Sequence, residues 1–117
     1  DLTLCQHLDS TFLGTIHELS ERSDQADIEF RIQGVTPDVE ELFLELGMEV
    51  VMDHIVPPVL PLPRQMEPLI GSELDKRSQA LHLLRVHQSL AALNESNLRE
   101  FDPLVEMLRH EVAALEP

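Results

Sequence analysis

The alternation of apolar and polar side chains predicts strands and helices that follow one another through the first half of the chain. Between Ile28 and Gln33 an apolar residue stands at every second position, which is typical of a strand with one buried face. Apolar runs at residues 2–8 and 50–56 indicate two more buried strands. Between these runs apolar residues recur every three or four positions, as on one face of a helix. The pattern therefore predicts a β-α-β-α-β order and an α/β fold.

Both predicted helices open on residues that commonly cap helices. The first follows Asp9 and Ser10, and either side chain has an oxygen that accepts from an unpaired backbone N–H group. The second opens at Thr36, which is followed by a proline that suits the first helical position, and Gly47 ends it. Strands joined by helices of this length imply right-handed crossovers, so we expect parallel strands with helices covering the sheet.

A proline-rich segment divides the chain. Four prolines fall between Pro57 and Pro63, and such a density favours an extended connector over a helix or a central strand. We therefore predict two parts. Residues 1–60 form the β-α-β-α-β portion, and residues 61–117 form the connector and a helical extension.

The pattern of the second part predicts an αα-hairpin. One helix is expected from Ser72 to about Leu93, and the turn Asn94–Asn97 separates it from a second helix. Pro103 interrupts the second helical pattern, so this helix is expected to begin there with Asp102 as its cap. The apolar residues of this second segment recur at steps of three and four and share one seam: Leu98, Phe101, Val105, Leu108, Val112 and Leu115.

Charge and cysteine content narrow the range of partners. The chain has 22 acidic and 8 basic residues and a formal net charge of -14. It should therefore repel nucleic acid and anionic membrane surfaces, and bind proteins with basic surfaces. No apolar run approaches the roughly 20 residues of a membrane helix, and the single cysteine, Cys5, allows no internal disulfide. These features suit a reducing cytoplasm, and the start at Asp1 without a signal-peptide pattern suggests a fragment of a longer protein.

Residues that could support catalysis or metal binding form no set with the required geometry. On a strand Cys5, His7 and Asp9 share one face, but no second acid is placed to orient the histidine. His82 and His87 are five residues apart, so on a helix they face different sides, unlike a zinc-binding pair four residues apart. His87 falls on the apolar seam of its helix, which favours a buried, hydrogen-bonded side chain. We therefore predict no enzyme activity, no metal ion and no cofactor.

The junction between the first predicted strand and helix resembles a known signalling family. An Asp-Ser-Thr group stands there and is followed within three residues by a leucine and a glycine. Further on, Val35 to Pro37 open a helix that ends on Leu46 and Gly47. Both motifs are similar in order and spacing to those of the STAS domain of bacterial anti-sigma factor antagonists, although Phe12 stands where glycine is commoner. The first motif consists of Asp9, Ser10, Thr11, Phe12, Leu13 and Gly14.

The resemblance covers residues 1 to about 56 and corresponds to the C-terminal part of the family domain. It implies a STAS-like mixed sheet with helices packed on it, partial at the N-terminus because the family's first two strands and first helix have no counterpart. A C-terminal helical hairpin would be added to this fold. A further similarity, to STAS proteins with a C-terminal extension, rests on Val86, His87, Leu90, Asn94, Asn97 and Phe101.

The resemblance implies an anti-sigma factor antagonist that is switched by phosphorylation. In the family, an anti-sigma factor that is a serine kinase modifies the serine after the motif aspartate, which is Ser10 here, and a serine phosphatase removes the phosphate. Thr11 is an alternative acceptor. A phosphate at a helix start meets unpaired N–H groups, and its added charge of about −1.5 to −2 would oppose docking of the partner. Residues 9–14 would then form the partner-binding surface.

The sequence leaves other interpretations open. Ser10 could serve only as a helix cap, and Phe12 belongs either to the core or to the partner surface. The chain could also be a STAS-type scaffold that is never modified. The helical hairpin could cap the incomplete sheet, form a homodimer or recruit a second partner.

Overall fold

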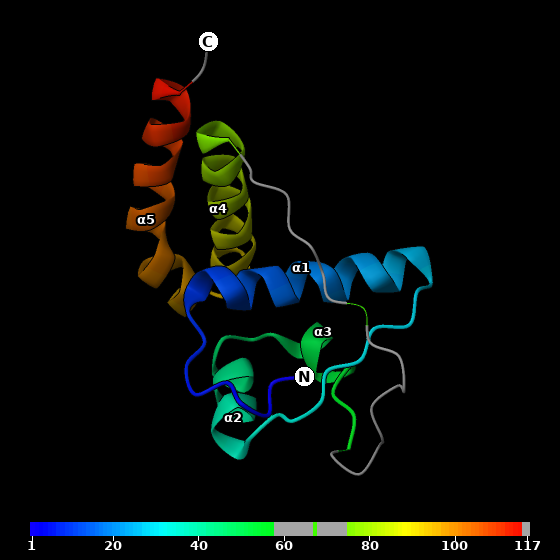
Figure 1. The fold of residues 1–117 in the computed structure, drawn as a ribbon. Coiled ribbons are helices and arrows are strands. Elements are labelled where there is room, and N and C mark those ends of the chain that lie inside the picture. The colour runs from blue at the N-terminus through cyan, green and yellow to red at the C-terminus, as the bar shows by residue number, and fades with distance from the viewer. Residues whose placement is uncertain (58–66, 68–74, 116–117) are drawn as a thin grey trace.

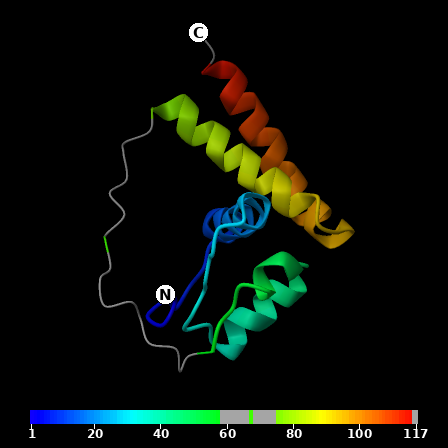
Figure 2. The ribbon, with the colours of Figure 1, turned by 90° about the vertical axis from the view of Figure 1, so that its right-hand side faces the viewer.

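The computed structural model describes residues 1–57, 67 and 75–115. The helices in this part of the chain are α1 (Ser10–Ala26), α2 (Pro37–Glu45), α3 (Glu49–Met52), α4 (Lys76–Ala91) and α5 (Glu95–Ala114). α1 runs across the middle of the molecule, with the α4–α5 hairpin on one side and α2 and α3 on the other (Figure 1). Seen almost along α1, the same three layers are stacked in Figure 2. α1 is therefore the layer that the other two share.

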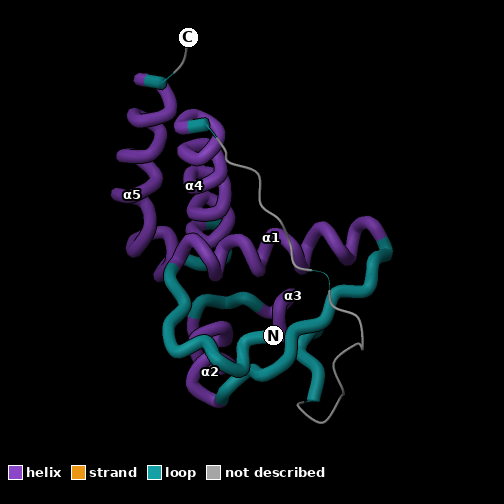
Figure 3. The backbone as a smooth tube through the Cα atoms, viewed as in Figure 1, coloured by secondary structure: helices purple, strands orange, loops and turns teal. Residues whose placement is uncertain are grey.

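The predicted STAS-like mixed sheet does not form, and the α/β fold class is wrong. Within the described ranges, the only pairing of extended segments is a parallel bridge between Ile32 and Ile55. Residues 2–8 and 28–33, both predicted as strands, run as loops (Figure 3). The protein is instead mainly helical.

The extended segments still lie side by side, but few backbone hydrogen bonds join them. Leu2 N donates to Gln33 O at 2.8 Å, Ile32 N donates to His54 O at 2.8 Å, and Val56 N donates to Ile32 O at 2.9 Å. A sheet is stabilised by a series of paired residues along neighbouring strands. One or two bonds on each side of a segment do not provide such a ladder.

The predicted strand at residues 50–56 is also wrong, because its first part belongs to the short helix α3. Met48 and Val51 are both completely buried, at 0% exposure. Their spacing of three residues places them on the same side of a helical turn. A short apolar run fits a buried strand and a buried helical turn equally well, so periodicity could not separate the two.

The predicted starts of α1 and α2 are confirmed. Asp9 is the N-cap of α1, where its carboxylate accepts from Phe12 N at 2.8 Å, so Ser10 is the first residue of the helix. The Thr36 hydroxyl caps α2 by accepting from a first-turn backbone N–H group at 3.3 Å. Gly47 follows the end of α2 with a φ of 72°, a left-handed conformation that glycine adopts without strain.

α4 and α5 form an αα-hairpin, as expected. Asp75 caps α4 and Asn94 caps α5, each by accepting from the backbone N–H group three residues further on. The predicted helix start at Ser72 lies outside the described residues, as does the proline-rich connector after Pro57.

The predicted helix start at Pro103 is wrong, since α5 continues through this residue. Asn94 already caps the helix further upstream. Val105 and Leu108, two and five residues beyond the proline, are each only 3% exposed. Burial of such side chains contributes about 1.5–3 kcal/mol each, which offsets the backbone hydrogen bond that proline removes.

Residues from both halves of the chain share one hydrophobic core. Phe43 of α2, Val51 of α3 and Leu90 of α4 are completely buried. The hairpin is therefore packed into the folded core through α4. The buried members of the cluster are Leu2, Leu13, Ile16, Ile32, Phe43, Met48, Val51 and Leu90.

α1 and α4 approach each other closely at Gly14. A Cβ atom added at this position would lie 2.7 Å from Val86 Cβ and 2.9 Å from Val86 O. Both distances are shorter than van der Waals contact, and tightly packed interiors have little room to yield. The crossing therefore requires a residue without a side chain.

Gly14→Ala should lower the free energy of unfolding by about 1–3 kcal/mol, because the new methyl group overlaps Val86. Alanine otherwise favours a helix over glycine by about 1 kcal/mol, so a loss in stability reports the tight crossing. Urea unfolding followed by circular dichroism measures the change. Val86→Ala keeps the Cβ and carbonyl atoms that the new methyl group meets, so the same loss is expected in a Val86→Ala background. A single Gly14→Ala variant as stable as the parent would contradict the close approach.

Candidate functional site

Ser10 stands where α1 begins and faces the hairpin. Its hydroxyl oxygen is part-buried and lies 2.8 Å from Nε2 of His87 in α4. The helix cap is Asp9, so the simple capping role considered for Ser10 is wrong. Ser10 and His87 are 77 positions apart in the sequence, and their contact joins the two halves of the chain.

His87 is buried and its ring is held in one orientation. The residue is 2% exposed, and Nδ1 lies 2.7 Å from Leu83 O one turn back in α4. A carbonyl oxygen only accepts, so Nδ1 of the neutral ring carries the hydrogen and Nε2 accepts from the Ser10 hydroxyl. The ring of Phe101 in α5 lies 6.0 Å away between centroids. The prediction of a buried, hydrogen-bonded histidine is confirmed.

A cavity of about 490 Å³ opens beside Ser10 and is lined by residues of α1, α2 and α5. Leu42 and Phe101 give it apolar walls, and Glu45 and Glu100 add two carboxylates. These carboxylates would repel an anionic ligand. The cavity therefore suits a neutral or cationic group.

The predicted partner-binding residues divide between exposed and buried positions. Asp9 and Phe12 are exposed, Phe12 by 40%, and Thr11 is half-buried. Leu13 is 4% exposed in the core, and Gly14 is buried against α4. In this fold, another protein could contact the segment mainly through Asp9 and Phe12.

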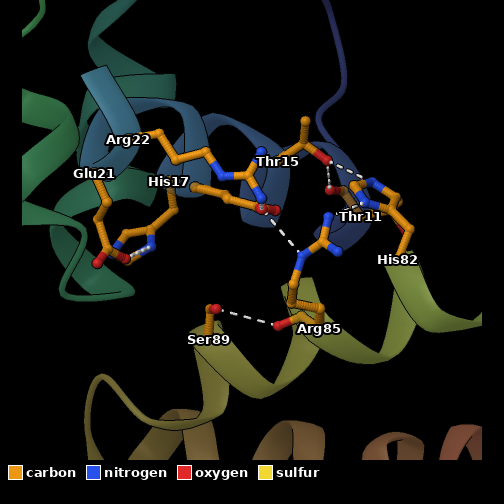
Figure 4. A network of polar contacts seen from close by, with 9 residues as sticks. Thr11, Thr15, His17, Glu21, Arg22, His82, Arg85 and Ser89 are labelled. Carbon is orange, nitrogen blue, oxygen red and sulfur yellow. Dashed lines mark hydrogen bonds and ion pairs between the residues drawn. The ribbon is translucent and has the colours of Figure 1, made fainter. Parts of the chain in front are cut away.

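A polar network joins α1 to α4 next to this segment (Figure 4). The Glu18 carboxylate lies 3.0 Å from Arg85 Nε of α4 and 2.7 Å from Arg22 Nη2 of its own helix. His82 of α4 places Nε2 3.2 Å from Thr15 Oγ1 and Nδ1 3.1 Å from Arg85 Nη2. The Glu18 side chain is only 15% exposed, so solvent screens its ion pairs less than those of a surface pair. The network fixes how α4 lies on α1.

Asn97 ties the hairpin turn to the end of α2. It is 2% exposed, and its Nδ2 donates to Leu46 O at 2.7 Å and to Leu90 O at 2.9 Å. Nδ2 of Asn94 donates to Leu46 O at 3.3 Å. The last carbonyl groups of a helix find no N–H donor within the helix, so the two amides donate to a carbonyl oxygen, that of Leu46, which would otherwise be costly to bury.

The tail residues that resemble those of extended STAS proteins all meet the first half of the chain. The sequence indicated these residues but not that they pack against the first half of the chain, and it did not predict the contact between Ser10 and His87. A single sequence gives no means to pair residues so far apart, and the histidine on an apolar seam was the one available signal. The six residues are Val86, His87, Leu90, Asn94, Asn97 and Phe101.

The other candidate ligands and nucleophiles are not brought together. Among the described residues, no group of three or more His, Cys, Asp or Glu side chains could hold a metal ion. His82 and His87 bond separately to Thr15 and Ser10 of α1, and Cys5 is half-buried with a free thiol. In the described part of the chain, no helix combines the length and the apolar character needed to cross a membrane.

Comparison with known proteins adds no assignment. No family model, curated protein or solved structure matches this chain. The similarity to STAS proteins rests on the two motifs and the tail residues, and it stays a prediction. Any functional assignment therefore depends on Ser10 and the residues around it.

His17, on α1, is a second buried histidine. It is 5% exposed, and its Nδ1 lies 2.9 Å from Glu21 Oε1 (Figure 4). Burial lowers the pKa of His17 from its ordinary value of 6.5, and the Glu21 carboxylate offsets only part of this effect. The folded protein therefore favours the neutral imidazole more strongly than the unfolded chain does.

The free energy of unfolding should rise with pH where only the unfolded chain holds a proton on His17. Stability increases with pH wherever the unfolded state binds more protons, so this contribution is complete above pH 6.5 and is lost as the pH falls toward the lower pKa of the folded protein. Urea unfolding of the parent and of His17→Gln at several pH values isolates it. A stability difference between the two that does not change with pH would show that His17 titrates alike in both states.

Asn97→Ala should destabilise the protein by about 1–3 kcal/mol, because Leu46 O and Leu90 O lose the buried Asn97 amide and keep only longer bonds, from Asn94 Nδ2 at 3.3 Å and Leu93 N at 3.2 Å. Ser96→Ala is the matched control at the neighbouring exposed position, where a change within about 0.5 kcal/mol is expected. Thermal unfolding of the two variants compares them. Equal effects would mean that the amide is not the anchor of the turn.

Proposed function

We propose that this chain is an anti-sigma factor antagonist, a module that regulates transcription by binding an anti-sigma factor of the serine-kinase type. The supporting observation is the position of Ser10 at the first residue of α1, with a part-buried hydroxyl beside a cavity. The partner kinase would phosphorylate this hydroxyl, and a serine phosphatase would reset it. These partners place the chain in the bacterial cytoplasm, as a binding protein without enzyme activity in this pathway.

The start of α1 suits a phosphate group. The N–H groups of Ser10 and Thr11 precede the first intrahelical bond, which Leu13 N makes to Asp9 O. Such first-turn N–H groups point out of the helix and bind anions. The positive end of the helix dipole adds about 0.3–1 kcal/mol of stabilisation for a negative charge.

The same phosphate would change how α1 contacts its neighbours. His87 Nε2 would lose the hydroxyl that donates to it at 2.8 Å. The new charge would also face Glu45 of α2 and Glu100 of α5, which line the cavity beside Ser10. Like charges repel strongly where water is partly excluded. Phosphorylation would therefore loosen α1 from the hairpin and from α2, and alter the surface offered to a partner.

The unmodified protein would dock through the exposed apolar part of α1. Phe12 is 40% exposed and Leu19 is 46% exposed, and both line an apolar cavity of about 260 Å³ together with Phe30. A net charge of -14 favours a partner with basic residues around an apolar centre. Phe12 is two residues from Ser10, so a phosphate would stand at the end of this surface.

A serine-kinase anti-sigma factor that binds this chain should, with ATP, transfer one phosphate to Ser10, and Ser10→Ala should lose the label. Thr11→Ala is the matched control and should be labelled like the parent. The phosphorylated chain should bind the kinase at least about tenfold more weakly, because the new charge opposes docking. Intact-mass analysis of protein from its native cells should show two populations that phosphatase treatment merges. A Ser10→Ala variant labelled as well as the parent would refute the assignment.

An unmodified scaffold is the second candidate function. His87 favours it, because this buried side chain already engages the Ser10 hydroxyl. The scaffold would use the same surface at all times. A homodimer could form through exposed apolar side chains of α5, where Leu98 is 49% and Met107 is 57% exposed. A single unmodified mass under all growth conditions supports this alternative.

A further inference from the structure

The pairing of Ser10 with His87 has the geometry of a nucleophile and its base. The Ser10 oxygen lies 2.8 Å from Nε2, within hydrogen-bond reach. In activated serines a histidine takes the hydroxyl proton while a third group holds the ring. Here Leu83 O accepts from Nδ1 at 2.7 Å and keeps Nε2 directed at the serine. The pair therefore needs no movement before a proton transfer.

The cavity gives an electrophile access to the same hydroxyl. Ser10 is one of the residues that line its volume of about 490 Å³, together with Leu42 and Phe101. Glu45 and Glu100 disfavour anionic compounds there. Negative charge that develops on a carbonyl oxygen near Ser10 would be stabilised by the positive end of α1. These features select an uncharged electrophile with a polarised carbonyl group.

We propose that Ser10 is an acyl-accepting nucleophile, with His87 as its base, toward small uncharged carboxylic esters that enter the cavity between α1, α2 and α5. The Ser10 oxygen forms a bond to the carbonyl carbon, and the bond from that carbon to the ester's alcohol oxygen breaks. The hydroxyl proton passes to His87 Nε2 and then to the departing alkoxide. The products are O-acyl-Ser10 and the free alcohol.

This reaction is independent of phosphorylation by a kinase. It uses the hydroxyl and the buried base of the free chain, whereas phosphoryl transfer requires a docked partner and ATP. Acylation of Ser10 can therefore be absent while phosphorylation is observed, and the reverse also holds. If both occur they compete, because each blocks the same oxygen.

The test uses p-nitrophenyl acetate with the full chain, and peptide mass spectrometry to locate the acetyl groups. Mapping is needed because Cys5, Lys76 and the terminal amine also react with this ester. Ser10 should be acetylated with release of one equivalent of p-nitrophenol. In His87→Gln the rate at this position should fall by about 100-fold, the usual contribution of a positioned base.

Ser89 is the internal control, because its hydroxyl donates to Arg85 O at 3.1 Å in place of a histidine. In the folded parent Ser10 should be acetylated much faster than Ser89, and in the urea-unfolded parent the two should react alike. This comparison needs no variant, so it decides the matter even if His87→Gln does not fold.

The dependence on pH separates a base from a structural contact. The Ser10 rate in the parent should fall in acid, and a folded His87→Gln variant should lack this fall. The ionisable side chains that line the cavity with Ser10 are Glu45 and Glu100, so Glu45→Gln and Glu100→Gln should retain the acid limb. Equal Ser10 and Ser89 rates in the folded parent, or equal Ser10 rates with and without His87, would overturn the assignment.

Discussion

Packing of the α4–α5 hairpin across α1 and against the end of α2 holds this molecule together. Leu90 of α4 lies in the same core as residues of α1, α2 and α3. Asn97 supplies the hydrogen bonds that allow Leu46 O to be buried at the end of α2. In the described first half, the extended segments are joined by only a few backbone bonds. The hairpin therefore supplies the packing surface and hydrogen bonds that neighbouring strands would supply in a sheet protein.

The acidic character of the chain makes its few basic residues important. The chain has only 8 basic residues against 22 acidic ones, so repulsion between the carboxylates destabilises the folded state. Two arginines, Arg22 and Arg85, converge on the part-buried carboxylate of Glu18 at the crossing of α1 and α4. Two of the eight positive charges are thus placed where two helices meet. The exposed surface is left predominantly negative, which suits a basic partner.

Local signals in the sequence predicted the longer helices, and they failed for the strands and for the short helix α3. A cap such as Asp9 or Thr36 acts within one turn, so a short motif is enough to place the start of a helix. A strand exists only if neighbours pair with it, and the alternation around Ile32 says nothing about those neighbours. Pro103 shows the same limit, because burial further along α5 outweighs a local helix breaker.

The candidate site divides in the same way. Ser10 could be placed at a helix start from the residues around it, whereas its partner His87 could not be found, since only the fold brings them together. Exposure of Phe12 and burial of Leu13 and Gly14 also depend on how α4 crosses α1.

The distance of 77 positions between Ser10 and His87 has a consequence for the protein during its synthesis. Translation proceeds from the N-terminus, so α1 leaves the ribosome well before α4 and α5 have been made. Until α4 and α5 emerge and dock, the Ser10 hydroxyl of a nascent chain has no contact with His87 and is exposed to solvent. Any enzyme or reagent that needs an unobstructed hydroxyl would find it most easily on unfinished chains.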